Sequence, residues 1–140
     1  MHLTQMIYAS TMTDPLSLDL VVQVLDTARD RNPRHGVTGM LVFGTERFLQ
    51  LIEGPPEAVN RLYRNLVADP RHRDLRLISA GPVAARRFPD WSMGFWTVAR
   101  GASPAAASGE QGRFAPHSLT PDAALRLLDE LAGQAKRSAA

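Results

Sequence analysis

The sequence contains no cysteine. Disulfides, thiolate metal sites and every mechanism that needs a cysteine nucleophile are therefore excluded. No apolar run approaches the roughly 20 residues that a membrane-spanning helix requires. The N-terminus, Met1 to Thr4, also lacks the basic and apolar regions of a signal peptide. These absences predict a cytoplasmic protein that does not engage a membrane.

The chain also lacks a strong excess of charge, since its formal net charge is +2 over 140 residues. Arginines are frequent between Arg61 and Arg87, where the acids are only Asp69 and Asp74, and such a cluster could suggest nucleic-acid binding. Exposed aromatic residues are not expected among these arginines, as they are found on surfaces that bind single-stranded nucleic acid. We therefore interpret the arginines as a solvated face and expect no nucleic-acid partner.

The hydrophobic content of 44% in a chain of this length fits one globular domain. Short β-prone runs predict strands, which we expect at residues 3–10, 36–43, 48–53, 75–83 and 91–98. Apolar residues at helical spacing predict one helix from Leu18 to Asn32, where Pro33 should end it. The same periodicity predicts a second helix between Pro55-Pro56 and Asp69-Pro70.

This order of elements, β-α-β-β-α-β followed by a fifth strand, predicts an α+β fold of the ferredoxin-like type. Its sheet should be rich in antiparallel pairs, with both helices on one face. Residues 1–100 would form this domain. Residues 101–118, rich in Gly, Ala, Ser and Pro, would be a linker. The apolar pattern of residues 119–140 predicts an amphipathic C-terminal helix with Thr120 as its N-cap. This helix should cover either the open sheet face or a partner subunit.

Two polar side chains interrupt the apolar strands. Alternation within residues 48–53 directs Gln50 toward the core, where an unpaired amide group would cost about 1–3 kcal/mol. Tyr8, in the first strand, also needs a partner for its hydroxyl. Each residue alone could be structural. Together with Asn32 they could converge on a flat heteroaromatic ligand between the helices, although the same pattern describes a filled core.

Several short motifs occur in the order in which they are found in BLUF domains, the sensors of blue light using flavin. These motifs are Tyr8-Ala9-Ser10, Asn32, Gly36-Val37-Thr38-Gly39, Phe48 to Gly54, Asp69 to His72 and Arg87 to Met93. The chain resembles this family from about Leu3 to Phe95. The combination of the FxQxxEG run with the later RxFxxWxM run is specific.

The resemblance implies a flavin, FAD or FMN, held noncovalently between the two helices. It also implies that Tyr8 gives an electron to the excited flavin and that a proton follows through Gln50. The pair then recombines without net redox change. What persists is a rearranged Gln50 amide, by rotation or tautomerisation, that shifts the absorption to the red.

The resemblance further assigns the site residues. The flavin-binding residues would be Tyr8, Arg31, Asn32, Gln50, Asp69, Arg71 and His72. The photoactive residues would be Tyr8, Gln50, Trp91 and Met93. Trp91 and Met93 are expected on one face of the fifth strand, with Met93 nearer to Gln50. Arg31 departs from many relatives, which carry a second asparagine there, and its guanidinium could reach a flavin carbonyl or phosphate.

The expected protein is a short, stand-alone sensor and not an enzyme. Its signal would pass through the fifth strand and the C-terminal helix to an unidentified downstream protein, or across a homodimer or higher oligomer. One alternative is an acylphosphatase-like hydrolase, but the chain lacks a glycine-rich phosphate loop that leads into a helix. Another is a ferredoxin-like regulator that binds a small molecule or RNA without photochemistry.

Overall fold

The computed structural model of the chain describes residues 2–13, 18–44, 46–97 and 114–139. Most of the expected linker, from residue 101 to residue 113, lies outside this part. No helix within it is long and apolar enough to cross a lipid bilayer.

Five strands form one sheet in the order β4-β1-β3-β2-β5. The strands are β1 (Leu3–Met12), β2 (Thr38–Gly44), β3 (Arg47–Gly54), β4 (His72–Val83) and β5 (Gly94–Thr97). Pairing is antiparallel throughout except between β2 and β5, which are parallel. The first four strands therefore have the ferredoxin-like order, and the expected fold class is confirmed.

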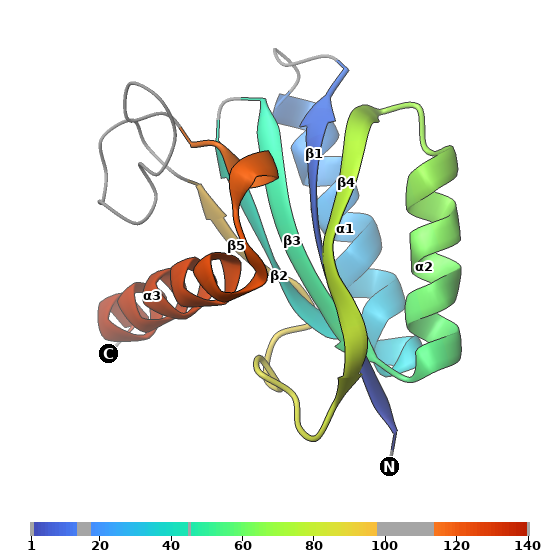
Figure 1. The fold of residues 1–140 in the computed structure, drawn as a ribbon, viewed down its shortest axis with the longest axis vertical. Coiled ribbons are helices and arrows are strands. Elements are labelled where there is room, and N and C mark those ends of the chain that lie inside the picture. Colours follow the sequence, from blue (N-terminus) through green and yellow to red (C-terminus); the bar gives the residue numbers. More distant parts are fainter. Residues whose placement is uncertain (1, 14–17, 45, 98–113, 140) are drawn as a thin grey trace.

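Two helices, α1 (Leu18–His35) and α2 (Pro56–Ala68), lie side by side on one face of the sheet, as Figure 1 shows. Apolar side chains of both helices pack on this face in one cluster. Its sheet members include Met6, Tyr8, Leu41, Phe48 and Ile52, and its helical members include Val21, Leu25 and Val59. The alternation of each strand thus directs Tyr8 toward the space beneath the helices.

Helix α1 does not end at Asn32, as the sequence predicted, but continues through Pro33 to His35. The preference of a residue before proline for extended backbone is overcome because the last turn is closed from beyond the helix. Gly36 has a φ of +69°, and the Val37 N–H bonds the Asn32 carbonyl at 2.9 Å. This is a Schellman closure, in which glycine takes the left-handed conformation.

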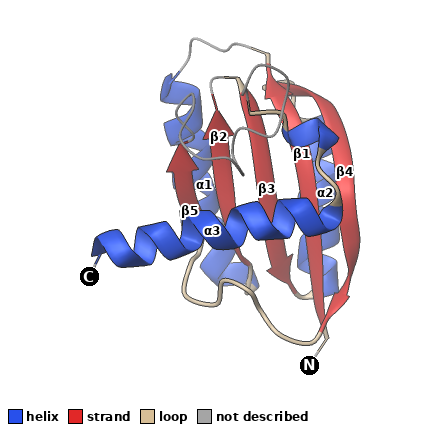
Figure 2. Ribbon diagram, turned by 60° about the vertical axis from the view of Figure 1, so that its left-hand side comes forward, coloured by secondary structure: helices blue, strands red, loops and turns tan. Residues whose placement is uncertain are grey.

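The opposite sheet face is covered by α3 (Pro121–Ala139), which follows the short 3-10 helix η2 (Pro116–Ser118) and crosses the strands (Figure 2). The buried residues on this side include Ile7, Met40, Leu49 and Leu51 of the sheet and Ala124, Leu127, Leu128 and Leu131 of α3. The Thr120 hydroxyl accepts a hydrogen bond from the Ala123 N–H at 3.2 Å, as an N-cap does. The predicted helix is confirmed, and of the two targets that the sequence left open, it packs on the open sheet face. Phe114, in the expected linker, is buried in the same cluster.

The fifth strand is shorter than the sequence predicted. It begins at Gly94, so Trp91 and Met93 lie in the turns before it, and the expectation that they share a strand face was wrong. Trp91 stacks on Phe88 at a centroid distance of 5.5 Å on the α3 side of the sheet, whereas Met93 is buried on the side of α1 and α2. Side chains of α1 hold the Ser92 and Met93 carbonyls, and the Gly39 N–H of β2 bonds the Trp91 carbonyl at 3.0 Å.

Candidate functional site

A slot opens between α1 and α2 above the sheet, in two adjoining hollows. Its walls include Val24, Thr27, Ala28, Arg31 and Asn32 of α1 and Leu62, Asn65 and Leu66 of α2. Its floor and ends include Tyr8, Ser10, Leu41, Phe48, Gln50, Ile52, Asp69, Arg71, His72 and Met93. Apolar side chains of both helices and of the sheet line much of the slot, and polar groups face it from both walls, the floor and one end, which is the composition of a site for a flat organic ligand.

Tyr8 and Gln50 face each other at the floor of this slot. They are direct partners in the register of β1 and β3, and only 4% and 6% of their surfaces are exposed. The Tyr8 hydroxyl donates a hydrogen bond to Gln50 Oε1, and Gln50 Nε2 donates to the Met93 sulfur at 3.3 Å. A primary amide carries two N–H bonds, so one remains for a ligand in the slot.

The Tyr8 phenol is kept in its protonated form. Burial raises its pKa well above the ordinary value, and the negative charge of Asp69 raises it further. Tyr8 is therefore a hydrogen-bond donor at every physiological pH.

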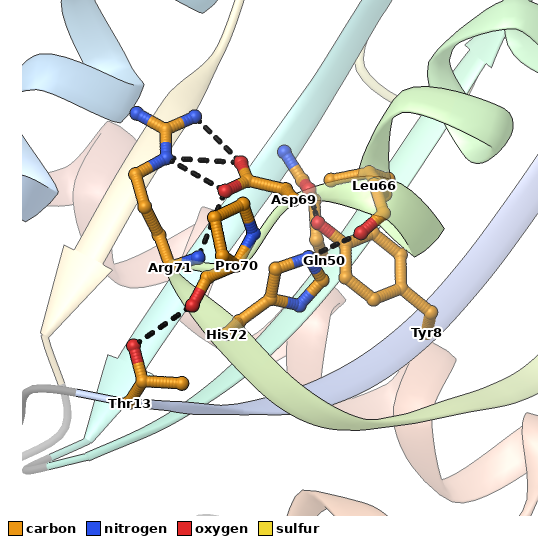
Figure 3. A network of polar contacts seen from close by, with 8 residues as sticks. All are labelled: Tyr8, Thr13, Gln50, Leu66, Asp69, Pro70, Arg71 and His72. Atoms are coloured by element: carbon orange, nitrogen blue, oxygen red, sulfur yellow. Dashed lines mark hydrogen bonds and ion pairs between the residues drawn. The ribbon is translucent and has the colours of Figure 1, made fainter.

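Asp69, Arg71 and His72 form a second polar group at the end of the slot, shown in Figure 3. The Asp69 carboxylate accepts bonds from Arg71 Nε and from the terminal guanidinium nitrogen at 2.6–3.0 Å. These hydrogen bonds are the main reason that the pKa of Asp69 lies below its usual range, so the pair stays charged. A doubly bonded guanidinium of this kind presents a fixed edge to the slot.

His72 lies beneath Leu66 in the same group. Its Nε2 is 2.6 Å from the Leu66 carbonyl, which requires the proton on that nitrogen. In the neutral ring Nδ1 is then an acceptor, and it is buried with no partner among the residues that the structure describes. A ligand hydroxyl is a suitable donor to such a nitrogen.

Asn32 is 3% exposed, and its Nδ2 donates to the Ser92 carbonyl at 2.6 Å. Arg31 contributes to the wall of the slot on its exposed side. All seven expected binding residues thus line the slot, five at its floor and end and two, Asn32 and Arg31, in its α1 wall. Trp91, expected among the photoactive residues, does not line it.

Sequence reasoning missed two residues of this region. Asn65 lines the slot from α2, and its position three residues after Leu62, within the apolar stripe, was the available signal. Arg29 donates from Nε to the Met93 carbonyl at 3.2 Å. No sequence pattern singles out Arg29, because its partner is 64 residues away along the chain.

The fold and the site define a class of protein with a slot for a planar ring between two helices. A buried phenol, amides and a guanidinium are placed to form hydrogen bonds with the edge of that ring. Comparison with known proteins agrees. The model of the BLUF family, described as sensors of blue-light using FAD, matches residues 3–94. The chain belongs to this family, and residues 3–94 form a flavin-binding blue-light sensor domain.

Relatives show the same domain in longer proteins. The chain is 37% identical over 86 residues to the blue light- and temperature-regulated antirepressor BluF of Escherichia coli, and 38% identical over 93 residues to photoactivated adenylate cyclase subunit beta of Euglena gracilis. These matches cover 61% and 65% of this chain but only 21% and 11% of the relatives. The chain therefore spans a small part of the curated proteins that it matches.

Solved structures extend the similarity beyond the sequence match. BlrB, a BLUF protein in its dark state, superposes with a TM-score of 0.65 at 39% identity, covering 72% of this chain and 75% of that chain. The ground state of BlsA superposes with a TM-score of 0.83 at 25% identity, covering 92% and 87%. BlrP1 of Klebsiella pneumoniae, 35% identical over 66% of this chain and 25% of its own, has been solved with FMN, with a TM-score of 0.59. Members of the family thus bind FAD or FMN.

Proposed function

We propose that the photochemistry of this domain runs through Tyr8 and Gln50, and that light is recorded as a new orientation or tautomer of the Gln50 amide. The observation that carries the proposal is the buried chain of hydrogen bonds from the Tyr8 hydroxyl to Gln50 Oε1 and from Gln50 Nε2 to Met93. The two ends of one amide contact an electron-rich phenol and a soft sulfur acceptor, so exchanging them changes both contacts.

A bound flavin supplies the absorption of blue light and an excited ring that accepts an electron. Tyr8 is the donor, and its phenolic proton leaves along the hydrogen bond to Gln50 Oε1 as the electron is lost. Gln50 would then hold this proton on oxygen and pass one from nitrogen to the ring that has taken the electron, or the whole amide would turn over. When the electron and proton return to Tyr8, only the arrangement of the amide differs.

The remaining residues hold the ring. Asn32, Arg71 and His72 are suited to its polar edge and to the hydroxyl-bearing chain, since they offer amide, guanidinium and imidazole groups at the margin of an apolar slot. Asp69 keeps Arg71 in place through its paired hydrogen bonds. Arg31, where many relatives carry asparagine, supplies a positive charge for a flavin carbonyl or phosphate.

The visible spectrum of purified protein, in the dark and after blue light, tests this proposal. The protein should show the bands of an oxidised flavin and a small reversible red shift. In Gln50→Leu the flavin should remain but the shift should vanish, because leucine offers neither donor nor acceptor. Gln23→Leu is the matched control, since Gln23 is exposed on α1 and does not line the slot. A red shift that survives in Gln50→Leu would contradict the proposal.

We also infer that the output of the chain is a contact rather than a reaction. The E. coli relative is named as an antirepressor and the Euglena relative as a cyclase subunit, so the domain serves different effectors. The expected route in this chain is from Met93 through β5 and α3 to an unidentified protein or a second copy. Light-dependent change in the elution volume of the protein, alone and with candidate partners, measures such association.

A further inference from the structure

The stretch from Arg86 to Met93, here called the 86–93 segment, leads from β4 toward β5 and is held at its start by β3. Glu53 of β3 is fully buried. Its carboxylate accepts the Phe88 N–H at 2.7 Å and the Arg87 N–H at 2.9 Å. A buried carboxylate is costly unless it is hydrogen-bonded, so these two bonds fix the backbone of the segment firmly to β3.

Arg86 strengthens the same attachment. Its guanidinium donates to the Gly36 carbonyl at 2.6 Å, to the Thr38 hydroxyl at 2.9 Å and to the Glu53 carbonyl at 3.3 Å. Thr38 in turn donates to the Glu53 carboxylate at 3.3 Å. The start of the segment is therefore tied to the loop after α1, to β2 and to β3.

The end of the segment reaches the photoactive pair. The Met93 sulfur accepts the Gln50 amide, and the Met93 carbonyl accepts Arg29 Nε. The Ser92 carbonyl accepts Asn32 Nδ2. Gln50 and Glu53 are three residues apart on β3, so one strand holds both ends of the segment.

The side chains of the two anchored residues face α3. Phe88 is buried in the cluster that contains Leu127 and Leu128, and the Arg87 guanidinium pairs with Asp129 at 3.1 Å. A shift of the segment thus alters the surface on which α3 rests.

On the basis of the proposed function, we propose that Glu53 is a positioning residue of the light response. By fixing Arg87 and Phe88 to β3, it makes the 86–93 segment a lever between the Gln50 amide and α3. Rearrangement of the amide moves Met93. Because Glu53 pins the backbone of Arg87 and Phe88 to β3, the segment pivots there instead of sliding, and the Phe88 and Arg87 side chains turn against α3 and loosen it. Without that anchor the segment yields at its start, and the movement does not reach α3.

The test compares wild type with Glu53→Gln, measuring the flavin spectrum, the rate of dark recovery, and amide hydrogen exchange of α3 in the dark and under blue light. Glutamine keeps one acceptor but places an NH2 group against a backbone N–H. We expect the flavin and the red shift to remain, the dark recovery to change at least about threefold, and the light-minus-dark exchange of α3 to fall by at least about half. Glu57→Gln, on the exposed first turn of α2, is the matched control and should behave as wild type.

A second variant keeps the proposal testable if Glu53→Gln does not fold. Asp129→Asn leaves the sheet intact and removes only the surface pair with Arg87, which contributes little to stability. It should keep the red shift and reduce the light-dependent exchange around residue 129, and Asp122→Asn on the same helix is its control.

Three results would overturn the inference, and they differ in whether the proposed function remains valid. If Glu53→Gln has wild-type recovery and wild-type exchange of α3, Glu53 has no positioning role. If wild type shows the red shift but no light-dependent exchange of α3, the lever is wrong while the sensor function stands. If wild type shows no red shift at all, the proposed function fails and the inference fails with it.

Discussion

The proposed role of the Tyr8 phenol and its burial place opposite demands on its proton. The phenol must lose a proton when it loses an electron, yet its burial makes the phenolate unfavourable. The bond to Gln50 Oε1 resolves this, because the proton has an acceptor in contact and no charged intermediate has to be solvated at the floor of the slot. The environment of Tyr8 therefore suits the proposed photochemistry, in which an electron and a proton leave the phenol together.

The raised pKa of Tyr8 predicts a pH dependence of stability. In the unfolded chain a tyrosine ionises near pH 10, whereas folded Tyr8 keeps its proton at that pH. The folded state then binds more protons than the unfolded state, so stability falls as pH rises above about 10 and is unaffected by Tyr8 below it.

Urea unfolding at pH 9 and at pH 10.5, for wild type and Tyr8→Phe, measures this contribution. We expect wild type to lose more stability than the variant over this interval, by at most about 1.4 kcal/mol per pH unit. Equal losses in the two proteins would show that Tyr8 is not the group responsible. Tyr63→Phe is the control, since Tyr63 is only partly buried and does not line the slot.

At the scale of elements, close approach of backbones positions the floor of the slot. Gly39 of β2 lies so near β3 that an added Cβ would collide with the Leu51 carbonyl. A larger residue at position 39 would push β2 away from β3, the strand that carries Gln50. Gly39 of the Gly36-Val37-Thr38-Gly39 motif therefore serves the geometry of the sheet.

The end of α1 offers a second prediction. Gly36 has a positive φ that costs a residue with a side chain about 1–2 kcal/mol, so Gly36→Ala should lower the free energy of unfolding by that amount. Gly133→Ala is a control of opposite sign, because Gly133 lies within α3 and an added Cβ meets nothing within 4 Å. It should stabilise the protein by up to about 1 kcal/mol. Chemical denaturation of both variants measures these effects, and destabilisation by both would contradict the conformational argument.

At the scale of the whole molecule, the sheet separates two apolar layers with different tasks. The layer beneath α1 and α2 contains the slot, and the layer beneath α3 is closely packed. The faces communicate through β3 and the 86–93 segment, since Gln50 and Met93 belong to one layer and Phe88 to the other. A change at the slot can in this way be read on the far side of the sheet.

The packing of α3 predicts the effect of a mutation there. Leu128 is fully buried against the sheet, so Leu128→Ala should cost about 2–5 kcal/mol of stability, as measured by urea unfolding. The exposed neighbour Arg126→Ala should change stability by less than about 0.5 kcal/mol. In folded Leu128→Ala protein the dark flavin spectrum should match that of wild type, because α3 does not line the slot. A small loss of stability would mean that α3 is only loosely attached.

Much of this protein was determined by local sequence. The order of strands and helices, the α3 stripe and the Thr120 cap follow from periodicity and capping, which depend on neighbours along the chain. Alternation likewise places Tyr8 and Gln50 each among the apolar side chains of its own strand. That the two are direct partners depends on the register of β1 and β3.

Tertiary structure alone decided the rest. The continuation of α1 through Pro33 depends on the Schellman closure at Gly36, and the separation of Trp91 from Met93 depends on bonds from Arg29 and Asn32, some 60 residues earlier. The same holds for Glu53, whose backbone partners lie 34 and 35 residues away. Such contacts form only when distant parts of the chain fold together, so the pattern of neighbouring residues does not predict them.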